Sequence, residues 1–126
     1  VPAFVGGIRA IEYIESHNVL DHATEVGTYI RSRFRELAED VPEIVDIRGK
    51  GQFTGVEFRI NGSHSKSLVE SIQRECYHRG VLVWYAGRQK SVLRLLPPLV
   101  LTQRQAEVGM DIIIESIREV LSDHEN

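Results

Sequence analysis

The sequence contains a single cysteine, a single methionine and a single tryptophan among its 126 residues. One cysteine, Cys76, cannot form an intramolecular disulfide, and such scarcity is typical of proteins kept in reducing compartments. No apolar run approaches the roughly 18 residues that a membrane helix needs. The first residues also lack the basic, apolar and small-residue succession of a signal peptide. We therefore expect a cytoplasmic protein without membrane attachment.

The chain also lacks any long block of like charge. Fifteen basic and 18 acidic residues give a formal net charge of −3. Binding to nucleic acid or anionic lipid depends on clustered positive charge, so we expect neither partner. The remaining composition, 42% hydrophobic and 26% charged, is close to the average of soluble globular domains. A chain of this length buries roughly two-thirds of its unfolded surface, which predicts one domain over residues 1–126.

Hydrophobic spacing predicts the order of the elements. Apolar residues recur at intervals of three and four near residues 4–14, 20–37, 68–76 and 106–121, which predicts helices there. Short β-type runs at 44–48, 53–60, 81–84 and 92–95 predict strands. The fold class that we expect is α+β, with a small, mostly antiparallel sheet of about three to four strands and helices packed on one face.

Three local patterns refine this prediction. Leu20 falls on the apolar stripe of the second helix, and Thr102 with Gln105 forms a capping box before the last helix. Gly6 and Gly7 lie inside the first helix, where each costs about 1 kcal/mol relative to alanine. Glycines in such a place predict a helix face pressed against other backbone. We expect that neighbour to lie outside this chain.

Few residues offer chemistry of their own. The histidines lack the spacing that brings ligands together on one metal, so we expect structural or surface roles for His17, His22, His64, His78 and His124. Cys76 lies on the apolar stripe of its helix, where a free cysteine usually behaves as a small buried hydrophobe. Gly49, Gly51 and Gly55 lead into a strand rather than a helix, so they favour a hairpin turn over a phosphate loop.

Arg94 interrupts an otherwise apolar segment at residues 92–96. One interpretation is structural: the side chain faces solvent, or it pairs with a carboxylate such as Glu57 or Asp46. The other is functional, because the planar fork of guanidinium donors suits bidentate binding of a substrate carboxylate. Residue chemistry alone favours neither interpretation.

Two further features near the predicted strands allow both structural and functional interpretations. Arg48 stands at the end of the first strand, beside the glycine-bearing turn. Arginines beside turns often donate hydrogen bonds to loop carbonyls, so we favour a structural role for it. Trp84 and Tyr85 form either an exposed aromatic patch that marks a partner surface or a part of the core.

The segment Val92-Leu93-Arg94-Leu95-Leu96-Pro97-Pro98-Leu99-Val100, with Ala86-Gly87 shortly before it, resembles the C-terminal part of class III aminotransferases. The likeness extends in particular to the 4-aminobutyrate and ornithine aminotransferase type. Upstream, Asp46-Ile47-Arg48-Gly49-Lys50-Gly51 followed by Gly55-Val56-Glu57 is similar to a second motif of the family. The likeness covers nearly the whole chain, although Gln52 and Phe53 replace the hydrophobic residues that we expect after that motif.

The resemblance implies that the chain is the C-terminal small domain of a pyridoxal-phosphate-dependent aminotransferase, separated from the large domain that holds the cofactor. It implies that Arg94 binds the substrate carboxylate and that Arg48, Gly49 and Gly51 shape the wall of the active-site entrance. The parent enzyme would be a homodimer that transfers an amino group from an amino acid to a 2-oxo acid. The family's imine-forming lysine belongs to the large domain, so we expect this chain alone to bind no pyridoxal 5'-phosphate and to be inactive.

Two functions of other classes stay open at this point. A stand-alone α/β module could sense a small carboxylate without catalysis, because a fold alone does not decide function. A dimerisation or scaffolding domain would bind no ligand at all. The chain begins at Val1 rather than at an initiator methionine, which favours the interpretation as a fragment.

Overall fold

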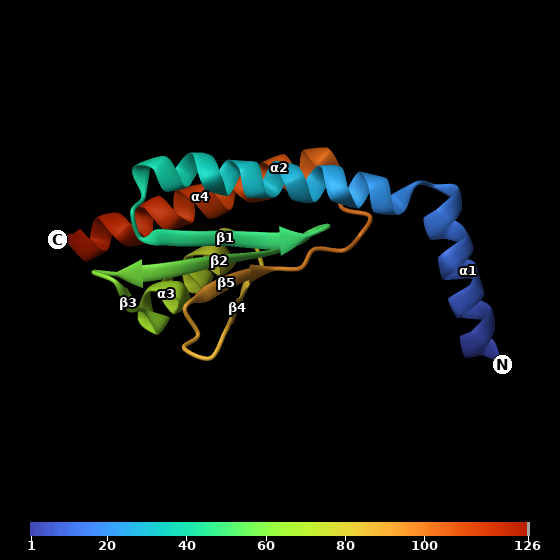
Figure 1. Ribbon diagram of the computed structural model, residues 1–126, viewed down its shortest axis with the longest axis horizontal. Coiled ribbons are helices and arrows are strands. Elements are labelled where there is room, and N and C mark those ends of the chain that lie inside the picture. Colours follow the sequence, from blue (N-terminus) through green and yellow to red (C-terminus); the bar gives the residue numbers. More distant parts are fainter. Residues whose placement is uncertain (126) are drawn as a thin grey trace.

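The computed structural model describes residues 1–125, which form four helices and five strands (Figure 1). The helices are α1 (Pro2–Ser16), α2 (Val19–Asp40), α3 (Lys66–His78) and α4 (Gln103–Glu125). The strands are β1 (Ile44–Lys50), β2 (Phe53–Ile60), β3 (Ser63–His64), β4 (Trp84–Ala86) and β5 (Val92–Leu95).

The strands form one antiparallel sheet in the order β1-β2-β5-β4, and the two-residue β3 adds a short pairing to β2. Helices α2 and α3 pack on one face of this sheet, and α4 packs against both helices (Figure 1). Within residues 1–125, no helix packs against the other face, which we call the open face. The predicted α+β fold with a mostly antiparallel sheet is confirmed.

The hydrophobic core lies between the sheet and the three helices. Its largest side chains include Phe34 of α2, Phe58 of β2, Leu93 of β5 and Ile117 of α4, each fully buried. Burial of one such side chain stabilises a fold by about 1.5–3 kcal/mol, so this layer supplies the main driving force for folding. The predicted capping box is confirmed at the start of α4: Gln105 N donates to Thr102 Oγ1, and Thr102 N donates to Gln105 Oε1.

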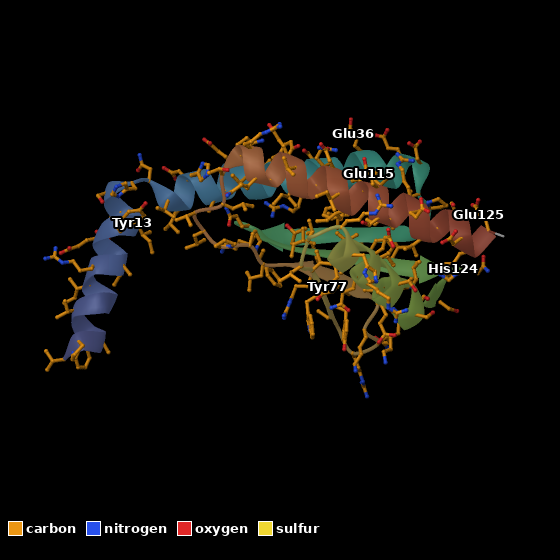
Figure 2. All side chains as sticks on the ribbon, turned by 180° about the vertical axis from the view of Figure 1, so that it is seen from behind. Tyr13, Glu36, Tyr77, Glu115, His124 and Glu125 are labelled. Atoms are coloured by element: carbon orange, nitrogen blue, oxygen red, sulfur yellow. The ribbon has the colours of Figure 1, made fainter. Side chains whose placement is uncertain are left out.

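Helix α1 contains no buried residue and extends away from the rest of the chain (Figures 1 and 2). Its apolar side chains are largely exposed, with Phe4 77%, Ile8 57% and Ile11 59% accessible. A Cβ added at Gly6 or Gly7 would meet nothing within 4 Å. The close neighbour predicted for these glycines is therefore absent from residues 1–125, and its position outside the chain stays a prediction.

Two local predictions are wrong. The strand predicted at residues 81–84 begins only at Trp84, because the preceding backbone is used elsewhere: Val81 N donates to Cys76 O after the left-handed Gly80, and Val83 O accepts from Gln73 Nε2. Leu20, predicted on the apolar stripe of α2, is 61% exposed. The helix begins at Val19, and Val19 rather than Leu20 is buried.

Helix α2 and the turn between β1 and β2 approach each other unusually closely. A Cβ at Gly27 would lie 1.7 Å from Gly51 O, so only glycine allows this contact. One turn further along α2, Arg31 Nη1 donates to Gly51 O at 2.8 Å and to Thr54 Oγ1 at 3.3 Å. Burial lowers the pKa of Arg31, with a smaller contribution from the nearby charge of Arg35. These contacts place the hairpin turn relative to the helices.

Candidate functional site

The open face of the sheet carries the polar residues singled out from the sequence. Strand register arranges its side chains in two neighbouring rows across the four strands. The first row consists of Arg48, Gly55, Arg94 and Trp84. The second row consists of Asp46, Glu57, Val92 and Ala86. The structure thus brings Arg48 and Arg94 onto one surface, on either side of Gly55.

A cavity of about 320 Å³ opens on this face. Its lining residues come from all four main strands and their loops, and they are Arg48, Gly49, Lys50, Phe53, Gly55, Ala86, Gly87, Val92 and Arg94. Three of these residues are cationic, none is acidic, and five are glycine, alanine or aliphatic. Gly55 has no side chain to fill the bottom of the cavity. A Cβ at this position would lie only 3.3 Å from Val92 Cγ1. The arrangement suits a small organic anion with an apolar body.

The Arg94 side chain lies in this cavity, half-buried, between the buried residues Leu93 and Leu95. Within residues 1–125, no hydrogen bond, ion pair or ring contact engages its guanidinium. The structural interpretation in which Arg94 pairs with Glu57 or Asp46 is therefore wrong. A partly desolvated guanidinium without a partner retains its full donor capacity for an anionic ligand.

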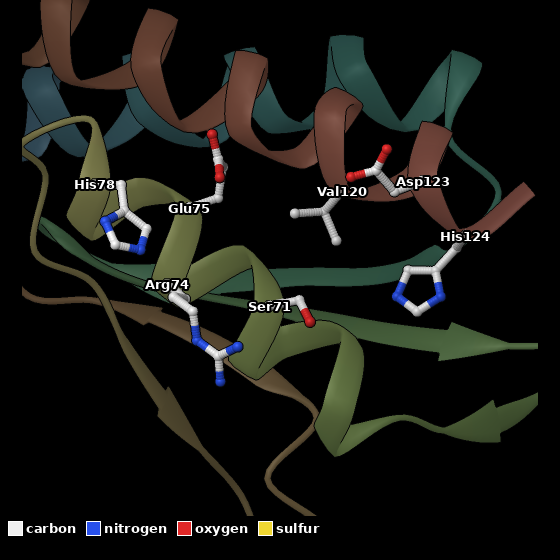
Figure 3. Close-up of a pocket in the computed structure, with 7 residues that line it drawn as sticks. All are labelled: Ser71, Arg74, Glu75, His78, Val120, Asp123 and His124. Atoms are coloured by element: carbon white, nitrogen blue, oxygen red, sulfur yellow. The ribbon is translucent and has the colours of Figure 1, made fainter. Parts of the chain in front are cut away.

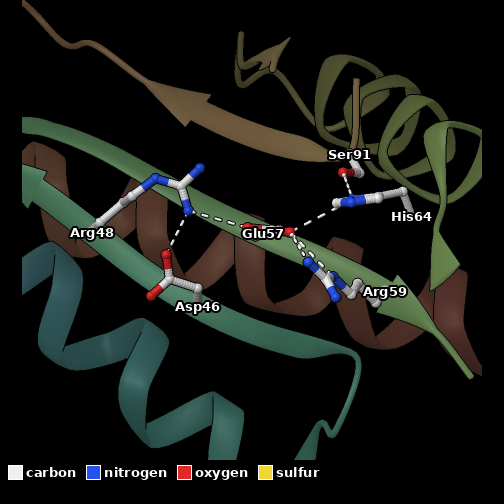
Figure 4. Close-up of polar contacts among 6 residues, drawn as sticks. All are labelled: Asp46, Arg48, Glu57, Arg59, His64 and Ser91. Carbon is white, nitrogen blue, oxygen red and sulfur yellow. Dashed lines mark hydrogen bonds and ion pairs between the residues drawn. The ribbon is translucent and has the colours of Figure 1, made fainter. Parts of the chain in front are cut away.

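Arg48 behaves differently, although it lines the same cavity. Its Nη1 forms ion pairs with Asp46 Oδ2 and, at 3.3 Å, with Glu57 Oε2 (Figure 4). These hydrogen bonds, first that of Asp46 and then that of Glu57, raise the pKa of Arg48 above its ordinary value. A structural role was expected for Arg48, but the acceptors are carboxylates rather than loop carbonyls. The arginine that does bond the turn carbonyls is Arg31, which the sequence patterns did not single out.

Glu57 is the centre of a polar network on the second row (Figure 4). Its Oε1 accepts from Arg59 Nε at 3.2 Å and Nη2 at 3.0 Å, and His64 Nδ1 lies 3.5 Å away. His64 Nδ1 also lies 2.8 Å from the Oγ of the buried Ser91, just before β5. The hydrogen bonds of Arg59 and then Arg48 hold the pKa of Glu57 below its ordinary value, even though burial acts in the opposite direction. Glu57 is thus a stable anion at neutral pH.

The other residues that line the cavity divide into wall and floor. Phe53 is 44% exposed and adds an aromatic wall, whereas Gly49 belongs to β1 and Gly51 to the turn that follows this strand. Gly51 itself does not line the cavity. Lys50 is an exposed cation that no described residue pairs with. The three lysines of the chain, Lys50, Lys66 and Lys90, are all exposed.

A second hollow, of about 340 Å³, lies between α3 and the end of α4 (Figure 3). It is lined mainly by charged and polar side chains: Ser71, Arg74, Glu75, His78, Val120, Asp123 and His124. Among residues 1–125, no group of three or more histidine, cysteine or acidic side chains is placed to hold a metal ion. This hollow therefore offers mixed charge without a convergent ligand set.

Two other sequence features are now placed. Cys76 is fully buried, as predicted, and burial raises the pKa of its thiol, which opposes nucleophilic chemistry. Trp84 is 55% exposed and stacks on the half-buried Tyr85, with ring centroids 5.3 Å apart, and both residues lie on β4 at the edge of the sheet. None of the helices described within 1–125 combines the length and apolar character needed to cross a bilayer.

Comparison with known proteins places this geometry in a family context. The model of the family Aminotransferase class-III matches residues 3–117. The alanine/serine racemase of Pyrococcus horikoshii is 36% identical over 113 residues, which cover 89% of this chain and 24% of the racemase. The 4-aminobutyrate aminotransferase of Escherichia coli is 29% identical over 120 residues, which cover 93% of this chain and 28% of that enzyme.

Solved structures share the fold. A phospholyase from Arthrobacter in complex with phosphoethanolamine superposes with a TM-score of 0.84 at 25% identity, covering 89% of this chain and 27% of that protein. Lysine aminotransferase from Mycobacterium tuberculosis superposes with a TM-score of 0.78 at 26% identity, covering 89% and 24% respectively. The chain spans only about a quarter of the length of the relatives that it matches.

Proposed function

The chain belongs to the class-III aminotransferases, and from this premise we propose that it forms the C-terminal small domain of an enzyme that transfers an amino group between an amino acid and a 2-oxo acid. The observation that carries the proposal is the unpaired guanidinium of Arg94 in the open-face cavity. In this proposal the open face turns toward the large domain of the parent protein. By family likeness, the parent is a homodimer of the 4-aminobutyrate aminotransferase type, and the scarcity of cysteine supports a cytoplasmic location.

Pyridoxal phosphate is the cofactor that membership of this family implies, and when bound it supplies the electron sink for amino-group chemistry. The residues of this chain do not fit that cofactor on their own. An imine-forming lysine is activated by desolvation or by a neighbouring cation, whereas Lys50, Lys66 and Lys90 are all exposed. We therefore assign the cofactor to the part of the parent protein outside this chain, and we expect the chain alone to be inactive.

The role that we propose for this domain is substrate recognition and orientation. Two parallel N–H···O bonds from Arg94 would fix both the position and the rotation of a substrate carboxylate. The apolar floor formed by Val92 and Ala86 and the wall formed by Phe53 would contact the carbon chain of the substrate. Holding a reactant in one orientation removes part of the entropic barrier to reaction, so a group remote from the chemistry still accelerates it.

The test is the steady-state kinetics of the full-length parent enzyme carrying Arg94→Ala. Each charge-assisted hydrogen bond to the carboxylate contributes about 1.5–3 kcal/mol. Loss of both should therefore lower kcat/KM for carboxylate substrates by about 100-fold or more. Arg88→Ala is the matched control, because Arg88 is an exposed cation in the neighbouring loop that does not line the cavity.

Arg94→Lys adds geometric information, since it keeps the charge but loses the planar fork, and it should recover only part of the lost activity. An Arg94→Ala enzyme with wild-type kcat/KM and KM would refute the carboxylate role. If the full-length reading frame proved to encode only this chain, the alternative of a stand-alone carboxylate-binding module would replace the aminotransferase proposal.

A further inference from the structure

Strand register and side-chain contacts together show why one arginine of the open face is paired and the other is not. Arg48 and Arg94 are the cross-strand neighbours of Gly55 on either side, so no side chain separates them. In the adjoining row, Asp46 stands beside Arg48 on the same strand and Val92 stands beside Arg94, whereas Glu57 lies on the strand between them, diagonal to both arginines. Register therefore gives Asp46 to Arg48 alone, and Glu57 forms its ion pair with Arg48 rather than with Arg94.

The carboxylates draw Arg48 toward the second row. Its Nη1 contacts Asp46 Oδ2 and Glu57 Oε2 together (Figure 4). Glu57 is itself anchored, because its other oxygen accepts two hydrogen bonds from Arg59. An anchored acceptor holds its donor more firmly than a mobile one, since less side-chain freedom remains to be lost. The guanidinium of Arg48 is thus both neutralised and oriented along its own edge of the sheet.

We propose that Asp46 and Glu57 are positioning residues that withhold Arg48 from the carboxylate site, so that Arg94 alone binds the substrate and the site favours ligands with one carboxylate at this end. The inference rests on the proposed function of Arg94. Without the two carboxylates, only the bare backbone of Gly55 lies between the arginines, and Arg48 can supply a second set of donors. The site would then gain affinity for dianions rather than lose affinity for carboxylates in general.

The experiment compares two four-carbon competitive inhibitors of the full-length enzyme, butyrate with one carboxylate and succinate with two. In the Asp46→Asn/Glu57→Gln double variant, the inhibition constant of succinate should fall about fivefold to tenfold, the range expected for one added charge-assisted contact at a partly exposed site. The constant for butyrate should change by less than about twofold, because Arg94 is untouched. A purely structural role would shift both constants together.

A triple variant without Arg48 tests whether Arg48 causes the change in the succinate-to-butyrate ratio. Adding Arg48→Gln to the double variant should return the succinate-to-butyrate ratio to that of the wild type. Glu57→Gln alone, a milder change, should shift the ratio in the same direction by a smaller factor, and it carries the test if the double variant does not fold. An unchanged ratio in the carboxylate variants, or a shifted ratio that persists without Arg48, would overturn the inference.

Arg94→Ala separates this inference from the proposal on which it rests. If Arg94→Ala leaves the butyrate constant unchanged, the carboxylate role of Arg94 fails. If it weakens butyrate binding while the carboxylate variants leave the ratio unchanged, only the withholding of Arg48 fails.

Discussion

Replacement of Gly27 by alanine tests the contact between α2 and the β1–β2 turn. Glycine in a helix interior is unfavourable by about 1 kcal/mol relative to alanine, so helix propensity alone predicts that Gly27→Ala stabilises the chain. The tertiary structure predicts the opposite. The new Cβ would lie 1.7 Å from Gly51 O and 2.6 Å from Gly51 C, both of them backbone atoms that cannot rotate away.

The expected loss of stability has two contributions, a steric one and a lost hydrogen bond. They would have to separate by more than about 1 Å, and overpacking of this kind costs about 1–3 kcal/mol. Separation would also stretch the 2.8 Å hydrogen bond from Arg31 to Gly51 O. A hydrogen bond from a charged donor contributes about 1.5–3 kcal/mol. After subtraction of the propensity gain, we expect Gly27→Ala to lower the free energy of unfolding by about 1.5–5 kcal/mol.

Urea unfolding of the 126-residue chain, followed by circular dichroism, measures this change. Gly109→Ala in α4 is the matched control, because a Cβ at Gly109 meets nothing within 4 Å. That variant should be more stable than the wild type by about 0.5–1 kcal/mol. The reasoning would be refuted if both variants shifted stability in the same direction, or if Gly27→Ala were as stable as the wild type.

Two further predictions concern titratable groups. Burial raises the pKa of the Cys76 thiol, so iodoacetamide at pH 8 should label the unfolded chain but not the native chain; mass spectrometry measures this, and rapid labelling of native protein would contradict it. Arg59 and then Arg48 lower the pKa of Glu57 below its ordinary value of 4.5. Its stabilising contribution is therefore complete above that value and is lost as the pH falls through the lower, folded-state pKa. The Tm advantage of wild type over Glu57→Gln should accordingly be present at pH 7 and shrink below about pH 4, whereas a constant difference from pH 7 to 3 would contradict this cause.

Much of the fold could be predicted because the hydrophobic period reports directly on helix and strand. The stripe from Ala23 to Leu37 in α2 and the β-type run at residues 53–60 led to the correct elements and to one antiparallel sheet. The wrong strand boundary falls where backbone hydrogen bonds rather than side chains decide the structure. Residues 81–83 have strand-like side chains, but the end of α3 and the amide of Gln73 take their backbone groups.

The candidate site could be predicted only in part. An arginine within an apolar strand predicted that Arg94 binds an anionic group. The sequence left open whether that group is Asp46, Glu57 or a ligand. The folded structure answers this question: register places Asp46 beside Arg48 and Val92 beside Arg94, and Glu57, which is diagonal to both arginines, pairs with Arg48. The role of Arg31 could not be predicted for a similar reason: its acceptor lies 20 residues away, in a turn that only folding brings to α2.

The sequence by itself determined the elements, their amphipathic faces, the buried Cys76 and the motifs shared with the class-III aminotransferases, since each of these depends on residues near one another in the chain. Tertiary structure alone decided which arginine of the open face is paired, which glycine allows α2 to touch the hairpin turn, and that α1 finds no cover within residues 1–125. These outcomes depend on distances between segments far apart in sequence, and such distances are set only when the sheet register and the helix packing form together.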